Sequence, residues 1–302
     1  MPALVCGSLA FDSIATFGGR FADQIMPNQL HVLNVSFLVP SLRREFGGCA
    51  GNIAYNLAAL GGEPVIVAAV GADGGDYLAR LRSWGATTEH VREVAEAFTA
   101  QAFIITDTDN NQITAFHPGA MQLAHATSVP ADKGIELAII APDGRDAMLQ
   151  NARQLHALKI PFVFDPGQQL PMFDGDALRH LVGQASWIAL NDYEARMLCE
   201  RMGTTLQALS DSHLRGVIVT LAAQGCEVWQ RGQRTHVPGV PATQVVDPTG
   251  CGDALRGALL HGLQQRWPLE RCVALGNRVG ALKIAHRGGQ NHPLSAQLLS
   301  GL

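Results

Sequence analysis

The chain has 302 residues, of which 47% are hydrophobic and 16% charged, so it can bury a large core without disulfide support. A formal charge of −4 with no run of Lys or Arg argues against nucleic acid or a membrane as the main partner and favours small-molecule chemistry. The six cysteines form no C-x-x-C pair, which argues against a zinc site or a disulfide framework. No signal peptide or membrane span is recognisable, and we expect a cytoplasmic protein.

Short apolar runs alternate with segments of helical periodicity along the chain. Runs that are apolar on both faces suit the strands of a parallel sheet. The strand–helix order predicts an α/β sandwich that forms a single domain over residues 1–302. The predicted strands are 3–6, 65–70, 137–141, 162–164, 187–190 and 217–220, and the predicted helices are 52–60, 77–84, 147–158, 194–201 and 254–265.

Two stretches, at about 13–45 and 98–120, interrupt this order, because β-forming residues there are broken by turn residues. We expect these insertions to form a small separate sheet. In the second stretch, apolar runs flank an acidic turn at 107–112, which predicts a hairpin. A calcium loop of the EF-hand type would need Gly and Glu where the chain has Gln112 and Pro118, so we interpret the acidic residues as turn formers.

The most informative segment reads DPTGCGD at 247–253 and continues into a predicted helix. The amides of Gly250, Cys251 and Gly252 can point at one anion at the start of the helix. Asp253 would then lie beside a bound phosphate, where it can act as a general base. Asp is also a common helix N-cap, so this segment alone leaves both roles open. It matches neither the P-loop nor the dinucleotide fingerprint.

Four further motifs, taken with this turn, resemble the ribokinase (PfkB) family of small-molecule kinases over essentially the whole chain. The first, GSLAFD at 7–12, delivers Asp12, which in the family binds sugar hydroxyls but alone would more often be a turn former. The second is FGGCAGNIAYNL at 46–57. Its Gly47 and Gly48 either allow substrate to approach the backbone closely or only interrupt the chain before a helix. Asn52 offers a hydrogen-bond donor and an acceptor.

The third motif, NDYE at 191–194, resembles the family's N-x-x-E element near magnesium and phosphate. It implies that Asn191 lies near ATP and that Glu194 binds Mg2+ through water, although Glu194 alone would be a solvated first-turn residue. The fourth, VTLAAQG at 219–225, is close to the T-x-G-x-x-G nucleotide segment and supplies Thr220 and Gly225. It carries Ala222 where the family usually has Gly.

The resemblance also implies roles for residues near the C-terminus. Asn277 and Ala281 fall on the helix that usually lines the adenine pocket, although core packing explains Ala281 equally well. Asp247 resembles the family's monovalent-cation loop, which implies stimulation by potassium. The family most often has D-T-x-G-A-G-D where this chain carries Pro248 and Cys251, and Cys251 is interpreted as a small thiol in place of Ala that contributes only its backbone amide.

The implied fold is a ribokinase-like three-layer α/β/α sandwich with a mostly parallel central sheet and a small β-sheet lid. Within the family, residues 17–52 and 107–121 look most like bacterial adenosine kinases. The implied reaction is ATP-dependent phosphorylation of the 5′-hydroxyl of adenosine with Mg2+, with the ribose on Asp12, Gly48 and Asn52. Aromatic residues of the lid are expected either to face the base or only to hold the lid together; these are Phe37, Phe103 and Phe116.

The sequence leaves other functions open. A ribokinase- or fructokinase-type sugar kinase would need a polar, tight pocket. A non-catalytic nucleoside sensor would keep the fold, although the presence of Asp253 argues against it, and a Rossmann-type oxidoreductase lacks its fingerprint. The resemblance also implies a homodimer through the lid strands.

Overall fold

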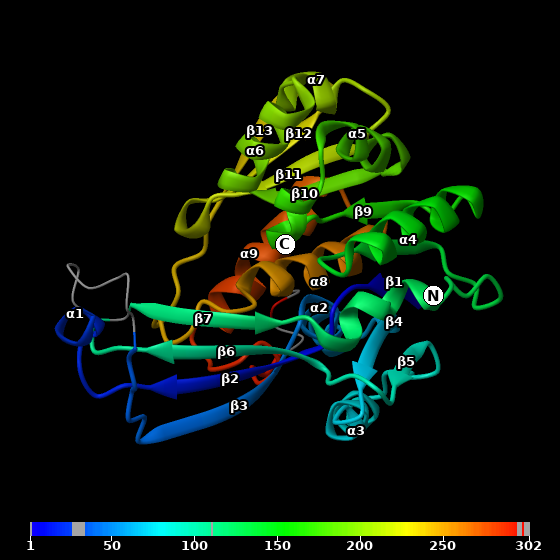
Figure 1. Ribbon diagram of the computed structural model, residues 1–302. Coiled ribbons are helices and arrows are strands. Elements are labelled where there is room, and N and C mark those ends of the chain that lie inside the picture. Colours follow the sequence, from blue (N-terminus) through cyan, green and yellow to red (C-terminus); the bar gives the residue numbers. More distant parts are fainter. Residues whose placement is uncertain (1, 26–33, 110, 295–297, 299–302) are drawn as a thin grey trace.

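The computed structural model describes residues 2–25, 34–109, 111–294 and 298. Its centre is a nine-stranded sheet in the order β13-β12-β11-β10-β9-β8-β1-β4-β5 (Figure 1). Neighbouring strands are parallel except at one edge, where β12 pairs antiparallel with β11 and with β13. The strands are β1 (Pro2–Cys6), β4 (Glu63–Gly71), β5 (Val91–Val94), β8 (Leu137–Ile140), β9 (Phe162–Phe164), β10 (Trp187–Asn191), β11 (Gly216–Thr220), β12 (Gly225–Gln230) and β13 (Gln233–Pro238).

Helices cover both faces of this sheet, as the apolar runs of the strands require. In β1, the side chains of Ala3 and Val5 pack with one helical layer and those of Leu4 and Cys6 with the other. The first layer contains α2 (Cys49–Ala59), α3 (Gly75–Ser83), α8 (Cys251–Gln264) and α9 (Leu269–Lys283); the second contains α4 (Arg145–Ala157), α5 (Gly175–Gln184), α6 (Asp192–Met202) and α7 (Leu206–Ser210). The predicted α/β/α sandwich is confirmed.

A second, four-stranded sheet projects from the body in the order β3-β2-β6-β7 (Figure 1). The strands come from the two predicted insertions and are β2 (Ala10–Thr16), β3 (Ser41–Gly47), β6 (Ala100–Thr106) and β7 (Gln112–His117), with the short α1 (Phe21–Gln24) at the far end. The β6–β7 hairpin is present, and Asp107 is a turn former, since its carboxylate accepts hydrogen bonds from the amides of Phe21, Asp109 and Asn111.

The register of the small sheet decides which side chains share a face. Asp12 pairs with Glu45 on β3 and with Ala102 on β6, and Ala102 pairs with Phe116. Phe116 therefore lies on the same face as Asp12. Phe103 pairs with Ser13 and lies on the opposite face, which removes it from the residues expected to contact a nucleobase.

Phe37 belongs to an aromatic cluster at the far end of the small sheet. Its ring centroid lies 5.0 Å from that of Phe17 and 5.1 Å from that of Phe21. These contacts favour the second expected role, in which Phe37 holds the lid together. Within the described part of the chain, no helix is both long and apolar enough to cross a membrane.

Candidate active site

The segment before α8 forms the tight turn that the sequence predicts. Gly250 is the N-cap of α8 and has φ 78°, a left-handed conformation that favours glycine. The helix begins at Cys251, so the amides of the first turn lie at its positive end. Asp253 lies within this first turn, where an anion bound by the amides would be next to its carboxylate.

A hydrogen-bonded chain holds the carboxylate of Asp253 in place. Its Oδ2 accepts a hydrogen bond from Nδ2 of Asn52 at 2.8 Å. The amide of Asn52 is oriented by Gln290, whose Nε2 donates to Asn52 Oδ1 at 3.2 Å and to the hydroxyl of Tyr77 at 2.7 Å. All three supporting side chains are buried. Sequence reasoning identified Asn52 but missed Gln290 and Tyr77.

Burial raises the pKa of Asp253 to about 6, and the hydrogen bond from Asn52 opposes this shift. Asp12 faces the same region from β2, and its pKa is also raised to about 6, first by burial and then by the charges of Asp253, Asp247 and Glu45. Both carboxylates are therefore ionised at neutral pH. The structure brings together the two acidic residues that the GSLAFD motif and the DPTGCGD segment supply.

The glycine pair after β3 lets the small sheet approach the body closely. A Cβ at Gly47 would lie 2.4 Å from Oδ2 of Asp12. At Gly48, where φ is 81°, a Cβ would lie 2.6 Å from the carbonyl oxygen of Ser8 and 2.6 Å from the amide nitrogen of Ala10. Backbone packing thus requires glycine at Gly48, whereas at Gly47 the added atom would displace the carboxylate of Asp12.

A buried ion pair that the sequence did not predict lies beside Asp253. Nε of Arg256 in α8 is 3.0 Å from Oδ2 of Asp165, and Nη2 of Arg256 is 3.4 Å from Oδ1. Both side chains are about 6% exposed. Asp165 contributes to raising the pKa of Asp253, whereas Arg256 contributes to lowering it. The pair therefore sets the charge around the predicted base.

The N-x-x-E motif starts helix α6. The side chain of Asn191 accepts a hydrogen bond from the amide of Glu194 at 2.7 Å, and Oε2 of Glu194 accepts one from the amide of Asn191 at 2.8 Å. This capping box is a structural role for both residues. Burial raises the pKa of Glu194, whose side chain is half-buried rather than fully solvated.

The other residues expected to contact ATP lie at the neighbouring strand ends. Thr220 ends β11, and its register partners are Asn191 on β10 and Cys226 on β12. The thiol of Cys226 lies 3.2 Å from Oδ1 of Asn277, whose amide also donates to the carbonyl of Pro238 at 3.0 Å. Gly225 begins β12, and Ala281 lies one turn beyond Asn277 in α9 and is half-buried.

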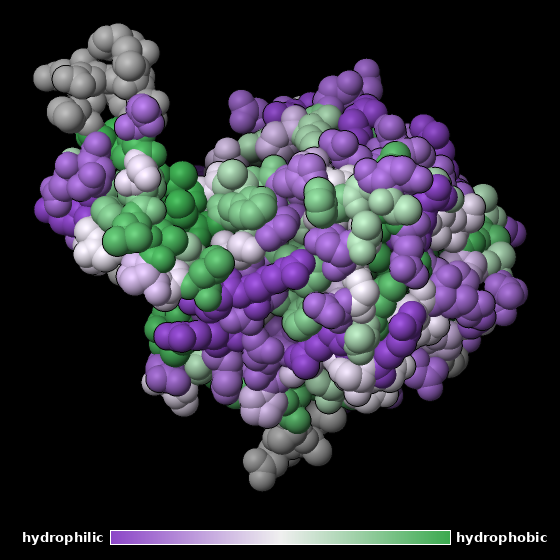
Figure 2. Space-filling view, turned by 60° about the horizontal axis from the view of Figure 1, so that its bottom comes forward, coloured by the Kyte–Doolittle hydropathy of each residue, from purple (hydrophilic) through white to green (hydrophobic). Residues whose placement is uncertain are grey.

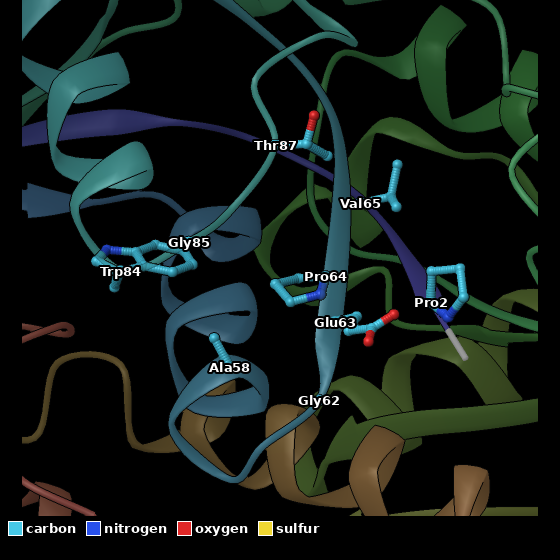
Figure 3. Close-up of a pocket in the computed structure, with 9 residues that line it drawn as sticks. All are labelled: Pro2, Ala58, Gly62, Glu63, Pro64, Val65, Trp84, Gly85 and Thr87. Atoms are coloured by element: carbon cyan, nitrogen blue, oxygen red, sulfur yellow. The ribbon is translucent and has the colours of Figure 1, made fainter.

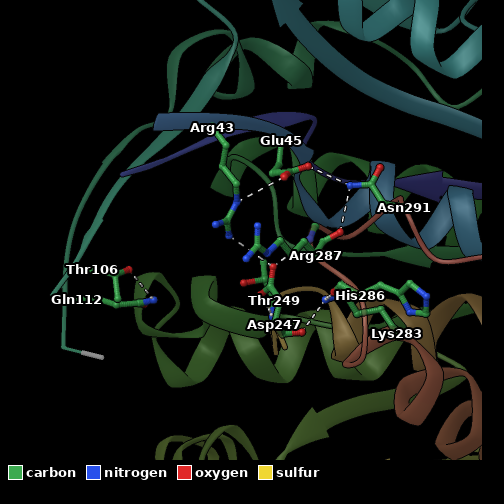
Figure 4. Close-up of polar contacts among 11 residues, drawn as sticks. Arg43, Glu45, Thr106, Gln112, Asp247, Thr249, Lys283, His286, Arg287 and Asn291 are labelled. Atoms are coloured by element: carbon green, nitrogen blue, oxygen red, sulfur yellow. Dashed lines mark hydrogen bonds and ion pairs between the residues drawn. The ribbon is translucent and has the colours of Figure 1, made fainter. Parts of the chain in front are cut away.

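Asp247, the residue expected at a cation loop, is itself held by several groups (Figure 4). Its carboxylate accepts hydrogen bonds from the amides of Thr249 and Gly288, both at 2.9 Å. Burial opposes ionisation, but these hydrogen bonds hold the pKa of Asp247 below its ordinary value. Its carbonyl oxygen accepts a hydrogen bond from Nζ of Lys283 at 2.7 Å, and Arg43 of β3 approaches the carboxylate at 3.9 Å.

A surface pocket of about 280 Å³ lies elsewhere, at the end of the central sheet where β1 and β4 begin (Figure 3). Its lining includes Pro2, Glu63 and Trp84. The acidic residues described above follow the other ends of the strands, so this pocket is not part of the site. Among residues 2–25, 34–109, 111–294 and 298, no group of three or more His, Cys, Asp or Glu residues is placed to hold a metal ion.

An α/β/α sandwich with a projecting small sheet, and a carboxylate in the first turn of the helix that follows a glycine turn, fit a small-molecule kinase. Residues 13–297 match the pattern of the pfkB family of carbohydrate kinases, and the chain belongs to this family. It is a phosphotransferase that acts on an alcohol group.

The relatives are kinases of nucleosides and sugars. A nucleoside kinase from Burkholderia thailandensis, solved in complex with inosine, is 45% identical, with a TM-score of 0.88 and coverage of 98% of this chain and 95% of that one. A nucleoside kinase from Methanocaldococcus jannaschii is 28% identical over 264 residues, 86% of this chain and 85% of its own. An ATP-dependent ribose-1-phosphate kinase from Halopiger xanaduensis is 28% identical over 264 residues, 84% of this chain and 86% of its own.

Proposed function

We propose that this kinase transfers the γ-phosphoryl group of ATP to the 5′-hydroxyl of adenosine or a related nucleoside, giving the 5′-monophosphate. The observation that carries the proposal is the carboxylate of Asp253. It lies at the start of α8, it is held by Asn52, and Asp12 faces the same region from the small sheet.

In the proposed reaction the 5′-hydroxyl oxygen bonds to the γ-phosphorus while the bond from that phosphorus to the bridging oxygen of ADP breaks. Asp253 accepts the hydroxyl proton, because a carboxylate with a pKa of about 6 is ionised at neutral pH. The amides of Gly250, Cys251 and Gly252 stabilise the charge on the transferring group. Asp12, Gly48 and Asn52 hold the ribose, and closure of the small sheet excludes water.

The nucleotide lies along Asn191, Thr220, Gly225, Asn277 and Ala281 in this proposal. Magnesium neutralises charge on the phosphates when it is bound. Glu194 fits a water-mediated role, because its capping hydrogen bond is accepted by Oε2 and a carboxylate has a second oxygen.

Phe116 supports a nucleoside over a free sugar. Its aromatic side chain shares a face with Asp12, is 49% exposed and can cover a base. The complex of the Burkholderia thailandensis relative with inosine is in keeping with a purine nucleoside. We place the reaction in the cytoplasm, since all six cysteines are free thiols.

The test is ATP turnover with Mg2+ against adenosine, inosine, guanosine, cytidine, ribose and fructose, with each product identified by mass spectrometry. Formation of AMP from adenosine supports the proposal, whereas phosphorylation of ribose or fructose alone would replace it with a sugar kinase. Phe116→Ala should raise KM for the nucleoside. Phe103→Ala, which changes the same residue type on the opposite face, is the matched control and should leave KM unchanged.

A further inference from the structure

The ammonium group of Lys283 is buried beside the catalytic turn. Lys283 is the last residue of α9 and has 0% exposed surface, whereas Lys159 is exposed and Lys133 is half-buried. These three are the only lysines in the chain. A buried charge is costly unless it is paired and hydrogen-bonded, so the position of Lys283 requires an explanation.

Two backbone carbonyl oxygens accept hydrogen bonds from this ammonium group. Nζ of Lys283 donates to the carbonyl of Asp247 at 2.7 Å and to the carbonyl of His286 at 3.2 Å. Asp247 precedes Lys283 by 36 residues and lies before α8, whereas His286 follows Lys283 by 3 residues and lies after α9. Figure 4 shows Lys283, Asp247 and His286 together at this junction.

The same two segments are joined by further backbone hydrogen bonds. The amides of Val246 and Asp247 donate to the carbonyl of Ile284 at 2.9 and 3.0 Å, and the amide of Gly288 donates to Oδ2 of Asp247 at 2.9 Å. Lys283 thus lies where loop 246–249 meets turn 284–288. Loop 246–249 leads directly into residues 250–252, so the position of their amides depends on the position of this loop.

The resemblance to the family implies a monovalent cation at Asp247, but the residues of this chain do not fit one. The carbonyl of Asp247 already accepts a hydrogen bond from the ammonium of Lys283, so a cation at this loop would have to compete with that ammonium for this oxygen. The ammonium is itself monovalent; burial lowers the pKa of Lys283, and the neighbouring charges of Asp247, Asp253 and Glu45 oppose this shift. It supplies at this junction the charge and the oxygen contacts that a bound potassium ion would supply.

We propose that Lys283 is a tethered cation that replaces the monovalent metal ion and positions the anion-binding turn, so that this kinase does not depend on potassium. It is a positioning residue, because it contacts the loop before the turn and acts on the reaction through that loop. The inference rests on the established phosphotransferase activity and not on which nucleoside is the substrate.

The first test is turnover in potassium, sodium and choline chloride at equal ionic strength. The wild-type protein should give the same kcat in all three salts. Lys283→Gln should lower kcat in choline chloride on the order of 10- to 100-fold, the size expected when reacting groups are misplaced. Potassium or ammonium ions should restore part of that loss. Lys159→Gln, at the exposed lysine, should behave as wild type.

The second test needs no substrate and therefore separates this inference from the proposed function. The midpoint of thermal unfolding should be the same for the wild type in potassium and in choline chloride. For Lys283→Gln it should be higher in potassium, because an ion that binds only the folded state stabilises it by mass action.

Three results would overturn the inference. The first is several-fold activation of the wild type by potassium, and the second is full turnover of Lys283→Gln in choline chloride. The third is a loss of kcat in Lys283→Gln that no monovalent cation restores, because Lys283 would then have a purely structural role. The wild-type salt series is decisive by itself if Lys283→Gln does not fold.

Discussion

Asp253 is the residue on which proton transfer depends. Replacing it with Asn keeps the size and leaves an oxygen that can accept the hydrogen bond from Asn52, but an amide cannot take the hydroxyl proton. We expect Asp253→Asn to fold, to bind ATP and to lower kcat by about 10²–10⁴-fold, measured under saturating substrate. Asp146→Asn, at an exposed position on α4, is the control. Near-normal turnover in Asp253→Asn would exclude it as the base.

The raised pKa values of Asp253 and Asp12, each about 6, predict an acid limb in the pH profile. The base works only when it is unprotonated, so kcat/KM should fall as the pH drops through about 6 and level off above it. Asp12→Asn should keep this limb if Asp253 carries it. A flat profile in wild type, measured from roughly pH 5 to 8, would contradict both assignments.

The same shifts affect stability in the opposite sense. A carboxylate whose pKa is raised by burial in the folded state binds protons more readily there than in the unfolded chain. Its contribution to the free energy of unfolding is therefore present at low pH and is lost as the pH rises through about 6. Asp253 thus works against folding at the pH where it is ionised as the base.

Sequence patterns identified residues whose role is indicated by the adjacent residues of a motif, such as Asp253 directly after the glycines of its turn. They missed Lys283 and Arg256 for a physical reason. A Lys in the last turn of a helix is ordinarily solvated and favourable there, and nothing within α9 shows that a loop 36 residues away covers it. Arg256 is likewise buried by Asp165, which is 91 residues away.

At the scale of elements, the buried pair of Asp165 and Arg256 links the end of β9 to the first turns of α8. Arg256→Met leaves the carboxylate of Asp165 buried without its partner, which typically costs about 3–5 kcal/mol of unfolding free energy. Urea unfolding measures the loss. The double variant Asp165→Asn with Arg256→Met removes both charges and should be less destabilised than Arg256→Met alone. Equal losses would show that the charge is not the cause.

The junction of β3 and α2 depends on Gly48. Gly48 and Gly61 both have a positive φ, 81° and 86°, so an Ala at either position meets backbone strain of about 1–3 kcal/mol. Only at Gly48 would the added Cβ also strike backbone atoms, those of Ser8 and Ala10. We expect Gly48→Ala to lose clearly more stability in urea than Gly61→Ala, and to lower kcat/KM as well. Similar losses in the two variants would mean that the close approach is not needed.

Strands that are apolar on both faces were predictable, and β9 matches its predicted range of 162–164. The antiparallel edge strands β12 and β13 were not predicted, because half-exposed strands at an edge carry polar residues such as Glu227 and Arg234. The face of Phe103 was not predictable either. Its run is apolar at consecutive positions, so the two-residue period is absent, and only pairing with β2 assigns the face.

At the scale of the whole molecule, the site is assembled from the body and the small sheet together. Arg43 on β3 approaches Asp247 at 3.9 Å, and Glu45 accepts a hydrogen bond from Asn291 at 2.9 Å (Figure 4). One face of the small sheet therefore contacts the loop before α8. The opposite face also contacts the body at its end near α3, where Phe11 packs against Tyr77 and Arg44 lies 3.3 Å from Asp73.

That opposite face carries exposed apolar side chains. Leu42 pairs with Ala15, Ala15 with Ile105, and Ile105 with Ile113, so the four share one row, in which Leu42 is 71% and Ile113 is 40% exposed. Phe103, 49% exposed, lies on the same face. Figure 2 shows hydrophobic residues gathered on the projecting part of the molecule. Contiguous exposed apolar surface of this kind marks an interaction site.

We propose that a second copy of the chain covers this face, so that the protein is a homodimer through its small sheets. Light scattering after size-exclusion chromatography should give twice the mass of 32.2 kDa for wild type. Leu42→Glu should shift the protein toward the monomer, because it buries a charge against apolar side chains at the contact. Leu158→Glu adds the same charge directly after α4, at a side chain that is 42% exposed, and should leave the dimer intact. A monomeric wild type, or equal dissociation in both variants, would contradict this interface.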